Sequence, residues 1–411
     1  MHAKANRYLK IYPLFMGLTS DLLFYIAINT LFFSINKGFS AAQIVSMSSF
    51  SQVVCIVLQF PILFVIKKIG NTASVRTSAI VLLLGAVFIT FGETYTLVLI
   101  GRIFHNVSFV FHSASTVALE NNLELLDKRG DFVRIRTAGT TAYAVITMLV
   151  SFVASFMYNL DNYLPMYACI ATCALGVVLS FFMKDCSSYD KIVAAPKKKE
   201  KTKIPIEKFI VLAVLTYALF YPIVDHIQGE GKLFIQDEVM LSFDVEQTAL
   251  IIGAILCASR VIRVFSNVVF ARLYEKYRGK VGVALPVLLS LSIAFLLFGS
   301  LIGGVLFKIL VMGLGYTVIL FVRDPFKLYI QDILFENTPK EQHQTLLTVL
   351  AFGVKVGGAG LGLVFSALLL EYPMILIVAI MLVIAVCEIF LALWLYRLVG
   401  SRSKKSNVPA A

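Results

Sequence analysis

Ionisable side chains lie inside long apolar segments of this chain, and their chemistry needs an explanation. Within residues 11–35, Asp21, Tyr25 and Asn29 follow one another at intervals of four, which places them on one face of a helix. An ionised group at bilayer depth costs at least ~2.5–3.5 kcal/mol, so it normally faces a cavity or a partner. We expect Asp21 to line a cavity and to carry a proton, with pairing to a neighbouring helix as the alternative.

A second set of such residues lies in the apolar segment 209–236. Tyr221 and Asp225 are again four residues apart, and His226 follows directly. Because histidine titrates near neutral pH, Asp225 with His226 is a second candidate proton carrier, and a packing histidine is the alternative. Pro222 and the two glycines after it predict a kink or break in this helix. Broken helices near the middle of a membrane are typical places for binding sites.

Cations outnumber acids inside the apolar segments of the second half. Arg260 and Arg263 share a helix face, and Lys355 lies near the middle of its segment. Guanidinium groups in a low-dielectric cavity suit carboxylate or phosphate ligands. If Asp324 neutralises Arg323 or Lys327, this excess of positive charge is smaller. The predicted ligand-binding residues of the whole chain are Tyr25, Asn29, Tyr221, Arg260, Arg263 and Lys355.

A polar stripe follows the segment 95–120 and most simply lines water. Its members are Arg102, Asn106, Phe109, Ser113, Thr116 and Glu120, flanked by His105 and His112. Arg102 lies toward the outer end, where extension of the side chain to the membrane surface is an alternative. At the cytoplasmic end, we expect Glu120 to pair with Arg134 or Arg136, as a gating or structural ion pair rather than a ligand contact.

The elements that hold these residues at depth follow from hydropathy. The chain of 411 residues is 59% hydrophobic and only 15% charged, and apolar segments recur along its whole length. Since a helical span needs roughly 20 mostly apolar residues, we predict an all-α membrane protein with about twelve transmembrane helices. The predicted spans are 11–35, 41–66, 77–93, 95–120, 137–159, 162–183, 209–236, 246–271, 281–301, 303–331, 342–370 and 372–396.

The net charge of +12 is explained by topology rather than by nucleic-acid binding. With these spans, the termini and alternate loops hold most of the lysines and arginines, whereas the opposite loops hold only Lys37, Lys232 and Lys308. The positive-inside rule then places both termini and the basic central loop in the cytoplasm. We expect a multi-pass protein of the plasma membrane, most simply a bacterial inner membrane, in contact with lipid and not with nucleic acid.

The two halves of the chain look like copies of one unit. Asp21 and Asp225 are 204 residues apart, and the same offset separates two helix-starting capping boxes that begin at Ser40 and Asp244. Six predicted spans lie on each side of a polar, charged linker. The predicted division is a bundle at 1–183, a basic cytoplasmic linker at 184–208, and a second bundle with a short tail at 209–411.

A basic loop containing glycine follows the second span of each half, at 67–70 and 272–280. With the repeat, the basic central loop and both termini inside, this chain resembles the major facilitator superfamily over nearly its whole length. That family carries Gly-x-Leu-x-Asp-Arg-x-Gly-Arg-Arg in this loop. Here Lys67 stands in place of the aspartate, and the second copy has Glu275 with one extra residue before Gly279. The resemblance implies two pseudo-symmetric six-helix bundles around a central cavity and transport by alternating access.

These observations favour a monomeric secondary transporter of a small polar, anionic organic solute, coupled to protons. A drug/proton antiporter, in which Asp21 meets a cationic drug, is the main alternative; a polytopic membrane enzyme and a non-transporting receptor are two others. We expect no catalytic residue, cofactor or metal site. The spans carry no paired acids or histidines at ligand spacing and no nucleotide-binding loop, and Cys169-x-x-x-Cys173 is better explained by packing.

Overall fold

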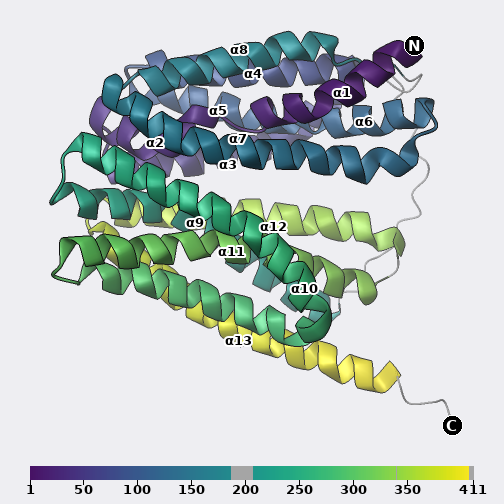
Figure 1. Ribbon diagram of the computed structural model, residues 1–411. Coiled ribbons are helices and arrows are strands. Elements are labelled where there is room, and N and C mark those ends of the chain that lie inside the picture. The colour runs from purple at the N-terminus through teal and green to yellow at the C-terminus, as the bar shows by residue number, and fades with distance from the viewer. Residues whose placement is uncertain (187–206, 339, 407–411) are drawn as a thin grey trace. The chain divides into compact units, whose positions relative to one another are not determined.

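The computed structural model describes residues 1–186, 207–338 and 340–406, and these are helical with no strand among them (Figure 1). Twelve helical segments in this part of the chain are long and apolar enough to cross a membrane. The predicted all-α fold with twelve spans is therefore confirmed. The chain divides into two compact units, Met1–Lys198 with Ala249–Cys257, and Lys199–Thr248 with Ala258–Ala411.

The helices of the first half are short and frequently interrupted. In chain order they are α1 His2–Thr19, α2 Leu23–Leu31, the π-helix Phe32–Asn36, α3 Ala41–Ile69, α4 Asn71–Phe91, α5 Tyr95–His112, α6 Ala114–Leu125, the 3-10 turn Arg129–Asp131, α7 Phe132–Leu160 and α8 Leu164–Phe182. Small residues bring α4 and α5 together, because a Cβ added at Gly101 would lie 2.9 Å from the backbone nitrogen of Ile89. Aromatic side chains of α1, including Tyr8 and Phe15, fill the core beside α4 and α6.

The first membrane span is broken at Asp21. The backbone leaves the helix after Thr19 and re-enters it at Leu23, so α1 and α2 are separate helices. The four-residue spacing of Asp21 and Tyr25 therefore crosses a break, and the prediction of one continuous helix face is wrong for Asp21. Further along the same span, the i→i+5 hydrogen bonding of the π-helix Phe32–Asn36 shifts the register once more.

The helices of the second half are longer. They are α9 Lys208–Met240, α10 Val245–Ser300, α11 Val305–Glu336, α12 Lys340–Leu368 and α13 Met374–Ser406. α10 contains two candidate spans, Val245–Arg263 and Lys280–Ser300, and its backbone leaves helical geometry between them at Tyr277. α9 packs against α11, α12 and α13.

α9 runs without interruption through Pro222 and the two glycines that follow it. The break predicted here is absent, so the interruption that the sequence placed in the seventh span occurs in the first one instead. Proline removes one backbone donor and leaves the carbonyl four residues earlier without its helical partner. That carbonyl belongs to Ala218, and Gly357 of α12 lies directly against it.

After α8 the chain is fixed to the first unit by a set of amide side chains. The carboxylate of Asp185 accepts hydrogen bonds from the amides of Asn71 and Asn121, at 2.9 and 2.8 Å. Asn122 binds the backbone on both sides of Asp185, accepting from the N–H of Cys186 and donating to the carbonyl of Lys184. The rest of the predicted linker, 187–206, lies outside the described residues, so the division into domains stays a prediction.

Candidate functional site

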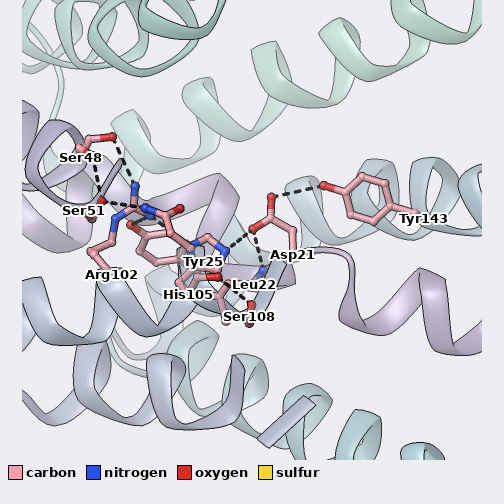
Figure 2. Close-up of polar contacts among 10 residues, drawn as sticks. Asp21, Leu22, Tyr25, Ser48, Ser51, Arg102, His105, Ser108 and Tyr143 are labelled. Carbon is pink, nitrogen blue, oxygen red and sulfur yellow. Dashed lines mark hydrogen bonds and ion pairs between the residues drawn. The ribbon is translucent and has the colours of Figure 1, made fainter. Parts of the chain in front are cut away.

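The break in the first span presents the Asp21 carboxylate to two other helices of the first unit (Figure 2). One carboxylate oxygen lies 2.8 Å from Nε2 of His105 on α5 and 2.8 Å from the backbone N–H of Leu22. The other accepts a hydrogen bond of 3.4 Å from the hydroxyl of Tyr143 on α7. His105 is only 5% exposed. The acid is therefore held by a neighbouring helix, as the alternative interpretation of the sequence expected.

Arg102 completes this network and defines the protonation of its neighbour. Its guanidinium donates to the Tyr25 hydroxyl at 3.0 Å, lies 3.4 Å from Nδ1 of His105, and reaches the Ser48 hydroxyl at 3.5 Å. A guanidinium can only donate, so Nδ1 must accept and the ring proton must be on Nε2. His105 is then a neutral imidazole that donates to Asp21. Figure 2 shows Arg102 directed into this network.

In the second unit, Arg323 of α11 contacts several polar side chains on one face of α9. It forms an ion pair of 2.9 Å with Asp225. It also donates to the hydroxyl of Tyr221 at 3.1 Å and to the side-chain oxygen of Gln228 at 3.3 Å. The guanidinium lies 5.2 Å from the centre of the Tyr221 ring, within cation–π range. One arginine thus holds two of the residues that the sequence predicted for this site.

Asp324 neutralises Arg263, whereas the sequence suggested Arg323 or Lys327. The guanidinium of Arg263 binds both carboxylate oxygens, at 2.8 and 3.2 Å, and the two side chains are 27% and 24% exposed. Arg260, one turn earlier on α10, differs because its Nε is buried with no hydrogen-bond partner. The bidentate pairing removes much of the positive charge that favoured an anionic ligand.

His226 is not paired with Asp225, although the two are adjacent. Its Nδ1 lies 2.8 Å from a carboxylate oxygen of Glu230, and its Nε2 lies 2.8 Å from the carbonyl oxygen of Gly358 on α12. The sequence suggested that Asp225 and His226 bind a proton together. In the structure each has its own partner: Asp225 pairs with Arg323, and His226 contacts Glu230.

The two halves use a similar arrangement of side chains. In each, the acid of the first span contacts a base of the fourth span, Asp21 with His105 and Asp225 with Arg323. In each, a tyrosine also binds the arginine of that fourth span, but Tyr25 follows its acid by four residues and Tyr221 precedes its acid by four. The two tyrosines are therefore not at equivalent positions, and the sequence repeat stays a prediction.

Two further predicted residues lie on the same elements as the networks or on a helix beside them. Asn29 is partly buried on α2, where its side-chain oxygen accepts from the N–H of Thr30, and Lys355 is partly buried on α12. The predicted gating residues are all exposed, and among the described residues no ion pair joins Glu120 to Arg134 or Arg136.

Several residues of the networks, including the central Arg102 and Arg323, were not predicted as site residues. His105 was noted only as a flank of the polar stripe, although it lies three residues after Arg102. Glu230 lies one turn after His226, and this spacing was a usable signal. Tyr143 lies in an apolar segment, and only the folded structure brings it to Asp21.

Comparison with known proteins identifies the fold. No protein-family model and no curated protein matches the sequence. Among solved structures, a point mutant of the nucleoside transporter NupG has a TM-score of 0.73 at 13% identity, covering 94% of this chain and 99% of that one. NupG itself has a TM-score of 0.68 at 14% identity, covering 97% and 99%.

A bacterial homologue of the iron transporter ferroportin, in its inward-facing state, has a TM-score of 0.70 at 12% identity, covering 96% of this chain and 98% of that one. At such identities the similarity concerns the fold and not the ligand. The chain is thus a multi-pass membrane protein with the fold of the major facilitator superfamily.

Proposed function

We propose that the protein is a secondary active transporter that moves a small polar solute by alternating access, coupled to protons at Asp21 and His105. The observation that carries this proposal is the 2.8 Å contact between a carboxylate and an imidazole at the break in the first span. Ionisable groups at bilayer depth mark ion and substrate pathways. The similarly folded structures, a nucleoside transporter and a bacterial homologue of an iron transporter, support a transport function.

The contacts of Arg102 suggest how protonation and binding are linked. While Arg102 occupies Nδ1 of His105, the imidazole cannot take a second proton, so an incoming proton must bind Asp21. A solute that draws the guanidinium away opens Nδ1 and changes the number of protons that the pair holds. Because such coupling is reciprocal, proton binding then changes the affinity for the solute by the same factor.

The ion pairs favour an uncharged polar solute over an anion. Arg263 and Arg323 already bind carboxylates, so neither is a free cation. The partly buried side chains of the networks, such as Ser48, Tyr221 and Gln228, instead offer hydroxyl and amide groups, which suit a ligand with several hydrogen-bonding groups. An organic anion is the second candidate substrate, because the buried Nε of Arg260 has no hydrogen-bond partner. We further propose a monomer in a bacterial inner membrane with both termini in the cytoplasm.

A ligand screen followed by uptake measurements tests this proposal. Purified protein is tested for thermal stabilisation by nucleosides and polyols, by carboxylates, and by lipophilic cations. Any stabilising compound is then followed into liposomes with and without a pH gradient. Stabilisation by uncharged solutes supports the first candidate, carboxylates support the second, and lipophilic cations alone would support a drug antiporter instead.

Asp21→Asn tests the coupling site directly. The variant should lose gradient-driven accumulation but keep exchange of solute across the membrane, because the amide cannot release a proton. Asp127→Asn is the control, since Asp127 is exposed outside the spans and has a positive φ of 53° that asparagine tolerates. If Asp21→Asn still concentrates the solute in response to a pH gradient, Asp21 is not the coupling residue.

A further inference from the structure

His226 and Glu230 form a buried pair on α9 whose geometry requires a proton. They are 6% and 5% exposed. Nε2 of His226 lies 2.8 Å from the carbonyl oxygen of Gly358, and a carbonyl can only accept, so Nε2 carries a hydrogen. Nδ1 lies 2.8 Å from a carboxylate oxygen of Glu230. Two lone pairs would repel at that distance, so a second hydrogen lies between them.

This second hydrogen belongs either to an imidazolium beside a carboxylate or to a carboxylic acid beside a neutral imidazole. Both forms hold one proton more than the neutral imidazole and the free carboxylate together. We infer that His226 and Glu230 are a second proton-binding site, distinct from Asp21, and that the bound proton holds α12 against α9. Only its role in coupling rests on the proposed transport function.

Charged groups of both signs surround the pair. The ion pairs of this region join the carboxylates of Asp225 and Asp324 to the guanidinium groups of Arg323 and Arg263, so these four charges cancel. Other ionisable residues on α9 and on the helices packed against it include Lys232 on α9, Tyr316 and Lys327 on α11, Lys355 on α12 and Glu388 on α13. The proton is therefore placed by the two contacts of the imidazole, and not by the sum of the surrounding charges.

Loss of the proton would break both contacts of the imidazole. With Nδ1 unprotonated, its lone pair faces the Glu230 carboxylate, and the ring must turn to relieve the repulsion. Turning takes the Nε2 hydrogen away from the Gly358 carbonyl, which is the bond between the helices. Phe365 of α12 packs edge-on against the imidazole, 5.3 Å between ring centres, so the turning ring also displaces α12. Deprotonation therefore loosens α12 from α9.

Glu230→Gln removes the titratable proton but keeps a hydrogen bond to His226. The amide can donate an N–H to Nδ1, which supplies the missing hydrogen without a titratable group, so the helices stay together at every pH. The matched control is Glu238→Gln, on the same helix, whose side chain pairs instead with Lys308. Spin labels at Leu241 and Leu370, exposed positions just after α9 and α12, report the distance between these helix ends.

Without substrate or gradient, the label distance in the parent protein and in Glu238→Gln should increase from acidic to alkaline pH, and Glu230→Gln should lose this response. A distance that does not change with pH in the parent, or a response that persists in Glu230→Gln, would overturn the inference. Nitrogen NMR of labelled histidine, with His226→Gln to assign the signal, tests the parent independently. A neutral imidazole beside an ionised Glu230 at acidic pH would refute the site. Neither readout depends on transport, so a failure of this inference can be distinguished from a failure of the transport proposal.

Discussion

Gly357→Ala should weaken the packing of α12 on α9, and the size of the resulting loss in stability can be worked out from the structure. A Cβ at Gly357 would lie 2.5 Å from the carbonyl oxygen of Ala218 and 3.2 Å from the ring of Pro222. Both belong to α9, and the oxygen is part of the backbone, so it cannot rotate away. The helices must separate by roughly 1 Å to restore ordinary van der Waals contact.

Gly360→Ala is the matched control on the same helix, because a Cβ there would meet no atom within 4 Å. Both variants gain helix propensity, at most about 1 kcal/mol. Only Gly357→Ala also carries the cost of overpacking, typically about 1–3 kcal/mol. We therefore expect Gly357→Ala to be less stable than Gly360→Ala by about 1–3 kcal/mol, which is roughly 5- to 150-fold in the unfolding equilibrium.

Denaturant unfolding in detergent micelles, followed by the fluorescence of the single tryptophan, Trp394, measures this difference. The same displacement lengthens the contact between Gly358 and His226, so the pH response of the label distance should shrink in Gly357→Ala and persist in Gly360→Ala. Equal stability of the two variants would show that α12 is not packed on the Ala218 carbonyl, and the reasoning about this contact would fail.

Two further substitutions test the ion networks. Arg102→Met removes the donor and the positive charge beside Nδ1 of His105, so the pair of Asp21 and His105 can take a proton more easily. The pH of half-maximal proton-driven uptake into liposomes should therefore move to a higher value. An unchanged pH profile would argue against the role of Arg102. Asp324→Asn leaves Arg263 without its counter-charge and should lower the free energy of unfolding by about 1–3 kcal/mol in the same assay. This value lies between those of exposed and fully buried ion pairs. A loss below about 0.5 kcal/mol would mean that solvent already screens the pair.

The number and type of elements could be predicted because the membrane imposes a length and a composition on each span. The helix starts were also accessible, since Ser40 and Gln43 form the predicted capping box and Asp244 accepts from the N–H of Gln247. The first span begins earlier than expected, at His2 and not at residue 11. Hydropathy detects only the apolar part of a helix, and the polar residues before it continue the helix beyond that part.

The partners within the site could not be predicted, because they come from segments far apart in the chain. No proline or glycine marks the break beside Asp21, which is held by His105 and Tyr143 on other helices. Conversely, α9 continues through Pro222, and the Ala218 carbonyl, whose helical donor the proline removes, lies against Gly357 of the neighbouring helix. Local propensity suggested an interruption at the wrong span, and tertiary contacts decided where it occurs.

The amide cage around Asp185 has a mechanical consequence for the connection between the halves. Because Asn71 and Asn121 hold the chain at Asp185, a pull on the following segment is transmitted to α4 and α6, and not to the end of α8 alone. Replacing either asparagine would therefore concentrate that load on the end of α8.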